Sequence, residues 1–397
     1  MDNQVELTFV ISHPIQYYSP LFVEIAKSDK FSDFEVLYCS SETIEGALDK
    51  QFNVHVKWDI PLLEGYKYRF LKNNSRKPSM YNGFFGLVNF ELISILKKKK
   101  KGGILIISGW NYFSYVFALF LGKIYGIKVY IRGESALCQE LKGSRFKLMV
   151  KKMIFWPLFK MYDKFLFIGK QNKLFYEHYG VKEKKLISSP YSVENSRFQS
   201  QYEKNIEQKS VFKEALNIPK NKKVILFAGK FTDKKRPFDL LNASLKCSKK
   251  EEVFLIFMGE GELRGKMQEF IDQHQMKNVL LTGFINQSEL YKYYIVSDLF
   301  VLSSGVGETW GLVTNEAMNF GLPCIVSNIP GSQDLVDHGK NGYVYECGDT
   351  DQLAHYIDKV VNNELPLESV RQSNLEMLNK HSYKTIIENL TGSIKQN

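Results

Sequence analysis

Short, continuous hydrophobic runs alternate with longer amphipathic segments along most of the chain. In the first half, the runs are rich in β-branched and aromatic residues and are bounded by Gly, Ser or Asp, which predicts buried strands. They are residues 7–12, 34–40, 103–108, 128–133 and 164–169, with helical patterns at 19–28 and 113–126. The second half repeats the rhythm, with predicted strands at 223–229, 253–259, 278–283, 299–305 and 323–328.

This alternation predicts an α/β protein with two doubly wound, mostly parallel sheets, because continuous apolar strands need helices on both faces. A polar stretch without sustained periodicity, residues 190–215, separates the two halves. The length of 397 residues suits two domains, each with its own core. We expect an N-terminal domain over 1–195 and a C-terminal domain over 196–375.

Two segments have enough apolar residues to be considered as membrane-spanning or membrane-binding segments. Residues 104–121 are mostly apolar, but Ser108 to Asn111 interrupt them where a strand should turn into a helix. We therefore expect a strand and a buried helix, and no transmembrane span.

In residues 145–165, six Lys or Arg interleave with large apolar side chains, and Pro157 should kink or end a helix. This pattern is typical of an interfacial membrane helix. A surface helix that packs on its own core remains the alternative.

Charge is unevenly distributed. The net charge is +10, with +12 in residues 1–200 and −2 in the remainder, and the first half includes the lysine run at 96–101. Such asymmetry predicts an anionic partner for the N-terminal domain, and we favour a membrane surface over nucleic acid. Five widely spaced cysteines without a C-x-x-C motif, and an acidic N-terminus, lead us to expect a reducing, cytoplasmic environment.

The densest group of candidate functional residues lies in GVGETWGLVTNEAMNFGLPCIVSNIPG, residues 305–331. If a helix begins near Trp310, Glu308 lies in the preceding loop and Glu316 in the second turn. The N–H groups at such a helix start can bind phosphate, and the acids can bind sugar hydroxyls. Alternatively, Glu308 caps the helix and Glu316 forms a surface pair. Several cations, Lys230 and Lys235 among them, follow the predicted strand at 223–229, where ligands bind in open α/β sheets.

These motifs resemble those of GT-B glycosyltransferases of the retaining family 4 type. The matching stretches of the second half are AGK(x4)K at 228–235, MGEGELRGKM at 258–267, LTGF at 281–284, GETWGLVTNEAMNFGLPCIVS at 307–327 and PGSQDLVDHGKNGYVYECGD at 330–349. In the first half, SHPIQYYSPLF, SGWN, RGES and SPYSVENSRF resemble a subgroup associated with surface-polysaccharide assembly.

The resemblance implies a GT-B fold, two Rossmann-like domains facing each other across a cleft, with residues 376–397 crossing back as a helix. It also implies catalytic roles for Lys230 and Lys235, which would neutralise the donor diphosphate, and for Glu308, which would contact the donor sugar. The donor-binding residues implied are Glu316 at the ribose, the backbone of Gly311, Leu312 and Val313 at the phosphates, Phe284 at the nucleobase, and Gly229.

The N-terminal domain departs from the family pattern. His13 stands where a Gly-Gly loop is frequent, and Arg132 and Glu134 stand where a His-Asp pair is frequent. We take these three residues, with Trp110 and Asn111, as candidates for the acceptor side of the cleft. For His13, a role at the helix entry without a ligand is an equal alternative.

The implied reaction is metal-independent transfer of a sugar from a nucleoside-diphosphate sugar to a lipid-linked or polysaccharide acceptor, with retention of configuration and without a cofactor. Two lysines and a helix start would stabilise the departing diphosphate. Asp349-Thr350-Asp351 spells a D-x-D motif, but it precedes a helical pattern, so we expect helix capping. A GT-B-shaped epimerase or phosphorylase, or a basic binding module without catalysis, remain as alternatives.

Overall fold

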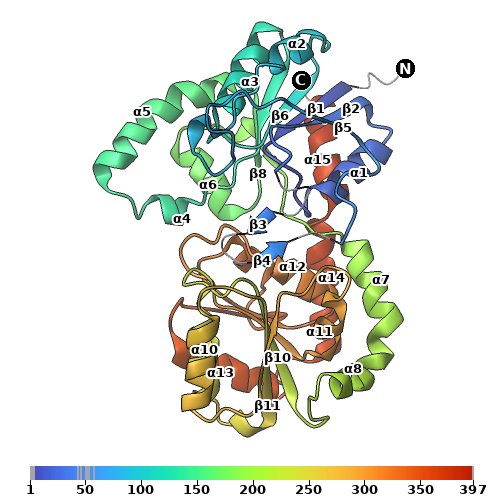
Figure 1. The fold of residues 1–397 in the computed structure, drawn as a ribbon, viewed down its shortest axis with the longest axis vertical. Coiled ribbons are helices and arrows are strands. Elements are labelled where there is room, and N and C mark those ends of the chain that lie inside the picture. Colours follow the sequence, from blue (N-terminus) through green and yellow to red (C-terminus); the bar gives the residue numbers. More distant parts are fainter. Residues whose placement is uncertain (1–4, 43, 45–46, 50–53, 57–58, 396–397) are drawn as a thin grey trace. The chain divides into compact units, whose positions relative to one another are not determined.

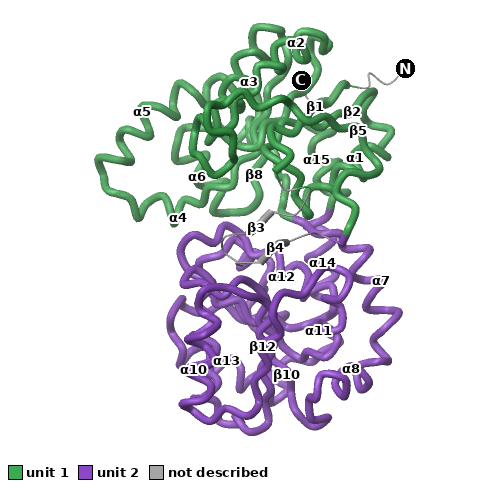
Figure 2. The backbone as a smooth tube through the Cα atoms, in the orientation of Figure 1, with its two compact units in different colours: residues 1–47, 60–191, 383–397 green, residues 48–59, 192–382 purple. Residues whose placement is uncertain are grey.

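The computed structural model describes residues 5–42, 44, 47–49, 54–56 and 59–395. The chain forms two compact units, shown in Figure 2. Unit 1 contains Met1–Ala47, Ile60–Tyr191 and Tyr383–Asn397, and unit 2 contains Leu48–Asp59 and Ser192–Ser382. The sequence placed the domain boundary at 195, whereas the units divide between Tyr191 and Ser192 and again at Tyr383.

Unit 1 is built on a parallel seven-stranded sheet in the order β5-β2-β1-β6-β7-β8-β9. Val10 of β1 pairs with Leu37 of β2 and with Ile107 of β6. The strands are β1 (Val5–Ile11), β2 (Phe31–Tyr38), β5 (Lys67–Phe70), β6 (Ile104–Ile107), β7 (Lys128–Ile131), β8 (Lys164–Phe167) and β9 (Leu186–Ser188).

Alternate residues of these strands belong to two apolar cores, one on each face of the sheet. Helices α2, α3, α5 and α6 contribute to one core, and α1 and α15 contribute to the other (Figure 1). Their bounds are α1 (Ser19–Lys27), α2 (Leu92–Lys97), α3 (Phe113–Ile124), α4 (Leu137–Glu140), α5 (Arg145–Met161), α6 (Lys170–His178) and α15 (Tyr383–Lys395). The last helix of the chain packs against α1 and β9, and Asn389 donates a hydrogen bond to the Ser188 carbonyl, at 2.9 Å.

Unit 2 contains a parallel six-stranded sheet in the order β12-β11-β10-β13-β14-β15. The strands are β10 (Lys223–Ala228), β11 (Val253–Met258), β12 (Val279–Gly283), β13 (Leu299–Leu302), β14 (Cys324–Ser327) and β15 (Gly342–Tyr345). The helices are α7 (Asn195–Asn205), α8 (Lys209–Ala215), α9 (Pro237–Lys246), α10 (Arg264–Gln273), α11 (Leu290–Val296), α12 (Val313–Asn319), α13 (Thr350–Val361) and α14 (Leu367–Lys380). A separate two-stranded pairing joins β3 (Ala47–Asp49) and β4 (Val54–Val56).

The ten predicted strands and the two helical patterns of the first half are present, so the predicted α/β class with two parallel sheets is confirmed. The run at 104–121 forms β6 and α3, as predicted. The expectation that α3 is buried is wrong in part, because Phe120 and Ile124 on its outer face are exposed.

Helix α5 continues through Pro157 to Met161, so this proline does not end the helix. Its only buried residues are Phe155 and Phe159, so most of its apolar side chains do not pack on the core of unit 1. Among the described residues, no helix combines the length and the apolar character needed to cross a bilayer.

Candidate functional site

The loop after β10 brings two lysines to the carboxyl edge of the sheet in unit 2. The hydroxyl of Ser303, directly after β13, donates hydrogen bonds to the carbonyls of Lys235 and Arg236, at 3.0 and 2.8 Å. The N–H of Gly305 donates to the Lys234 carbonyl at 2.7 Å. Since β10 and β13 are neighbours in the sheet, these bonds fix the lysine loop beside the segment that leads to Glu308.

The two lysines converge on Glu308. Lys235 Nζ forms an ion pair with Glu308 Oε2, and Lys234 Nζ lies 3.9 Å from the same oxygen. Burial lowers the pKa of Lys234, while the Glu308 carboxylate opposes that shift. The structure therefore joins Lys235 and Glu308, two residues that the sequence proposed for one site.

Glycines make room at this edge. Gly229 has φ +151°, and a side chain there would meet the methylenes of Lys235 at 3.5 Å. Gly259 lies so close to the Gly229 carbonyl that an added Cβ would be 1.9 Å from that oxygen. The loops after β10 and β11 can approach each other this closely only because Gly259 carries no side chain.

The segment before α12 is held by a buried tryptophan. Trp310 Nε1 donates to the Asn315 side-chain oxygen at 2.9 Å, and the N–H of Ser332 donates to the Trp310 carbonyl at 3.0 Å. Gly311 has φ +94°, which excludes helical geometry there, so α12 begins at Val313. The prediction that the helix begins near Trp310 is therefore wrong by three residues, and Glu316 lies in the first turn of α12 instead of the second.

Glu316 is buried, with 1% of its surface exposed, and it faces α11. Tyr294 of α11 donates a hydrogen bond from its hydroxyl to Glu316 Oε2 at 2.7 Å. The Tyr294 ring stacks on Phe320, with ring centres 5.0 Å apart. The alternative, a surface pair for Glu316, is thus wrong, because the carboxylate is buried and accepts a hydrogen bond from a neutral donor.

The other predicted donor residues have defined places in unit 2. Lys230 follows β10, Phe284 follows β12, and Leu312 and Val313 stand at the start of α12. Asp349 caps α13 by accepting a hydrogen bond from the Gln352 N–H at 2.9 Å, which confirms the capping prediction. Among the described residues, no group of three or more His, Cys, Asp or Glu side chains is arranged to hold a metal ion.

The carboxyl edge of the sheet in unit 1 holds a second charged cluster. Arg132, which follows β7, is 4% exposed and lies between the rings of Tyr18 and Tyr191, at 4.9 and 5.0 Å from their centres. Both phenol hydroxyls donate to Glu134 Oε1. Burial tends to lower the pKa of Arg132, but the two tyrosines and Glu134 hold it above its ordinary value. Sequence reasoning proposed Arg132 and Glu134 but missed the two tyrosines that enclose them.

The other candidates of unit 1 each have their own surroundings. His13, after β1, shares a hydrogen bond with the Ser12 hydroxyl at 2.9 Å, and burial lowers the pKa of its imidazole to about 4. Trp110 packs its indole against Phe155 and Phe159, with ring centres 5.1 and 5.5 Å apart. Asn111 is exposed at the start of the α3 segment.

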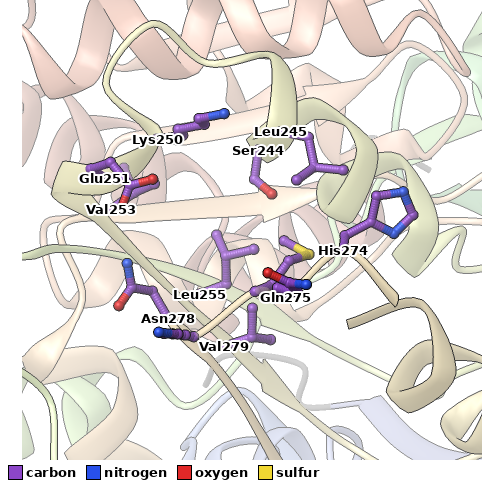
Figure 3. A pocket seen from close by; sticks show the side chains of 12 residues that line it. Ser244, Leu245, Lys250, Glu251, Val253, Leu255, His274, Gln275, Asn278 and Val279 are labelled. Carbon is purple, nitrogen blue, oxygen red and sulfur yellow. The ribbon is translucent and has the colours of Figure 1, made fainter. Parts of the chain in front are cut away.

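A hollow of about 330 Å³ lies at the other end of the sheet in unit 2 (Figure 3). It opens where β11 and β12 begin, beside the turn that follows α10. Its polar lining includes Lys250, Glu251, His274, Gln275 and Asn278. The candidate site lies at the carboxyl ends of the strands, where ligands of parallel α/β sheets bind. This hollow lies where strands begin, so it is separate from the candidate site.

Comparison with known proteins agrees with the motifs of unit 2. Residues 208–377 match the family described as glycosyl transferases group 1. This match lies within unit 2 and spans less than half of the chain. An uncharacterized glycosyltransferase of Methanocaldococcus jannaschii is 30% identical over 158 residues, which are 40% of each chain. An Escherichia coli enzyme, UDP-Gal:alpha-D-GlcNAc-diphosphoundecaprenol alpha-1,3-galactosyltransferase, is 31% identical over 156 residues, 38% of this chain and 39% of that enzyme.

These curated relatives are matched over only about two fifths of their length. The fold likeness extends further. The crystal structure of Anabaena Alr3699/HepE in complex with UDP superposes with a TM-score of 0.70 at 13% identity, and it covers 99% of this chain and 100% of that one. The expected GT-B fold is confirmed, and the resemblance to group 1 glycosyl transferases is supported within residues 208–377.

Proposed function

We propose that this protein is a glycosyltransferase that moves a sugar from a nucleoside-diphosphate sugar to a lipid-linked or polysaccharide acceptor during surface-glycan synthesis. The observation that carries the proposal is the convergence of Lys234 and Lys235 on Glu308 at the carboxyl edge of a parallel sheet. Two ammonium groups beside a carboxylate suit a ligand that carries both a diphosphate and sugar hydroxyls.

Charge determines the mechanism that we propose. As the bond between the sugar and the diphosphate breaks, negative charge grows on the phosphate oxygens and positive charge on the sugar ring. Lys230 and Lys235 stabilise the first, together with the N–H groups of Gly311, Leu312 and Val313. Glu308 holds the donor sugar, and Glu316 holds the ribose. The lysines supply the positive charge that a divalent cation would otherwise supply, so transfer proceeds without a metal.

Retention of configuration follows if the acceptor hydroxyl attacks from the side on which the diphosphate leaves. In this scheme, a departing phosphate oxygen takes the hydroxyl proton, and no side chain acts as a nucleophile. The Escherichia coli relative is named for a UDP-Gal donor and a diphosphoundecaprenol-linked acceptor, which supports a lipid-linked acceptor here.

A lipid-linked acceptor requires the enzyme to reach a membrane. Helix α5 carries exposed apolar side chains, among them Met153 at 71% exposed, Ile154 and Trp156. Exposed lysines alternate with them, and Lys160 Nζ lies 3.1 Å from the centre of the Trp156 ring. We place α5 and residues 96–101 against the anionic inner face of the cell membrane, with the protein on the cytoplasmic side.

Donor binding provides the direct test. The melting temperature should rise with one nucleoside diphosphate, and with the matching NDP-sugar, in a panel of UDP, GDP, ADP and their sugars. A ligand at roughly 100 times its Kd stabilises by about 2.7 kcal/mol. Glu316→Ala should remove this shift, whereas Glu269→Ala, an exposed carboxylate on α10, should keep it.

Product analysis separates transfer from other reactions of sugar nucleotides. Incubation with donor and a lipid-linked acceptor should yield a glycosylated lipid and free nucleoside diphosphate, and EDTA should leave the rate unchanged. Conversion of the donor sugar without an acceptor would instead indicate an epimerase. A protein that binds none of the nucleotides would contradict the proposal.

A further inference from the structure

Helix α3 is covered on one face only. Its inner face contributes Tyr115, Ala118 and Leu119 to the core of unit 1. The opposite face carries apolar residues at spacings of four, three and four, which align along one side of a helix. They are Phe113, Phe117, Phe120 and Ile124. Phe117 is partly buried against the core, whereas Phe120 and Ile124 are exposed, so packing within the unit does not explain the apolar character of the last two positions.

Neighbouring segments extend this outer face into a continuous aromatic surface. The ring of Phe113 lies 5.9 Å from that of Phe85 and 6.3 Å from that of Phe84, both in a 3-10 turn at 84–86. Phe90, before α2, lies 6.0 Å from Phe117. We name this surface the phenylalanine patch; it comprises Phe84, Phe85, Phe90, Phe113, Phe117 and Phe120, with Ile93 and Ile124 beside them.

Most of the patch is exposed to solvent, and Phe113 and Phe117 are partly buried at its base. Phe85 is 65% and Phe120 is 47% exposed, and large apolar side chains rarely gather in this way on a soluble surface without a binding partner. The rings contact one another through both stacked and edge-on arrangements, as between Phe113 and Phe117 at 5.4 Å. The patch is thus a formed surface of unit 1.

Segments rich in cations flank the patch residues in the sequence. Residues 71–128 contain ten Lys or Arg and a single acid, Glu91. Lys99 is neutralised within the unit, since its Nζ lies 3.0 Å from both Glu6 and Glu35. The other cations of the two segments that border the patch are exposed: Lys72, Arg76, Lys77, Lys97, Lys98, Lys100 and Lys101.

From this combination we propose that the phenylalanine patch inserts into the headgroup region of an anionic bilayer, with the lysines of the flanking segments on the lipid phosphates. Phenyl rings and aliphatic side chains suit the boundary between headgroups and acyl chains. A second copy of the chain would bring two strongly cationic surfaces together, which like-charge repulsion opposes. Nucleic acid would match the charge but leave Ile93 and Ile124 without an apolar partner.

This inference adds the phenylalanine patch to the membrane contact that we proposed for α5 and residues 96–101, and it does not depend on the transfer reaction. Helices α3 and α5 contribute to the same core on one face of the sheet in unit 1. The two surfaces would then act as two anchors of one unit. Two weak anchors bind a membrane far more tightly than either one alone.

Vesicle co-sedimentation tests the proposal with the full chain. The lipid is phosphatidylcholine with or without phosphatidylglycerol. The variants are F85S/F120S in the patch, K97E/K98E at its border, M153S/W156S in α5, and the matched control V211S/L367S, which removes two exposed apolar side chains from unit 2. We expect F85S/F120S and K97E/K98E each to weaken binding to anionic vesicles roughly tenfold or more, and the control to bind as the wild type does.

Each result has a definite meaning. Circular dichroism and an unchanged urea unfolding transition show that a variant is folded, and K97E/K98E tests the patch without touching its packed rings. Wild-type vesicle binding by both patch variants overturns the inference, and loss of binding in M153S/W156S alone would then leave only the α5 contact. Binding of single-stranded RNA instead of vesicles, or a dimer that F85S/F120S dissociates, would also overturn it.

Discussion

The carboxyl edges of the two parallel sheets each carry a charged cluster, but the clusters are built in different ways. In unit 2, Lys234 and Lys235 face Glu308 on loops, and the side chain of Lys234 is 45% exposed. In unit 1, Arg132 is enclosed by two tyrosine rings and by Glu134. The first cluster keeps one partly exposed ammonium group, on Lys234, whereas the Arg132 guanidinium is buried. We therefore expect an incoming phosphate to compete with Glu308 for the lysines of unit 2, and we expect Arg132 to act mainly on the stability of unit 1.

The strongest way to test this difference is to remove Lys235. Lys235→Ala should lower kcat/KM for the donor by about 10²–10³-fold, because a pre-positioned cation stabilises the leaving diphosphate. The matched variant Lys234→Ala should lower it by about tenfold or less, because that side chain is more exposed and its charge is better screened. Release of nucleoside diphosphate from the donor measures both. Full activity in Lys235→Ala would show that Lys235, at the carboxyl edge of the sheet in unit 2, does not bind the donor diphosphate.

The second test concerns Arg132. Arg132→Leu should reduce the free energy of unfolding of unit 1 by about 3 kcal/mol, because it leaves the Glu134 carboxylate without its buried counter-charge. Arg145→Leu, at an exposed site on α5, should change it by less than about 0.5 kcal/mol. Urea titration followed by tryptophan fluorescence measures the change, and the affinity for nucleotide should stay unchanged. A fully stable Arg132→Leu variant that fails to use acceptor would instead make Arg132 a ligand-binding group.

The sequence was informative where local pattern decides structure. Continuous apolar runs identified most strands, and the run from Gly307 to Ser327 identified the segment that holds Glu308 and Glu316. The start of α12 was misplaced, because it depends on the positive φ of Gly311 and on the Trp310 hydrogen bond to Asn315. Neither is visible as a periodic pattern.

Three-dimensional proximity explains the other failures. Tyr18 and Tyr191 stand 173 positions apart in the sequence, and only the order of strands in the sheet brings both to Arg132. Strand β15 was missed because it is short and begins at Gly342, where a Cβ would lie 1.9 Å from the Cys324 carbonyl oxygen. Helix α3 is apolar on all sides, so the sequence could not distinguish its buried face from its exposed one.

The third test uses the pH dependence of His13. Its pKa is about 4 in the folded protein, below the ordinary value of 6.5, because burial disfavours the charged imidazole. The unfolded chain therefore binds more protons between these two values, and the stability of unit 1 should fall by about 2 kcal/mol as the pH drops from 6.5 to 4. His13→Gln should lose this part of the pH dependence, as measured by urea titrations at several pH values. An unchanged pH profile would show that His13 is not buried as a neutral group.

The smallest expected effect tests whether the buried acid of unit 2 is positioned for a ligand. Tyr294 holds Glu316 through one hydrogen bond of 2.7 Å, and its ring packs on Phe320. Tyr294→Phe keeps the ring and removes the bond, so KM for the donor should rise about fivefold, equivalent to about 1 kcal/mol, while kcat stays near the wild-type value. Tyr291→Phe on the same helix is the matched control and should leave both constants unchanged. A loss of thermal stability without a change in KM would mean that the bond supports only the fold. Glu316 would then not belong to the donor site of unit 2.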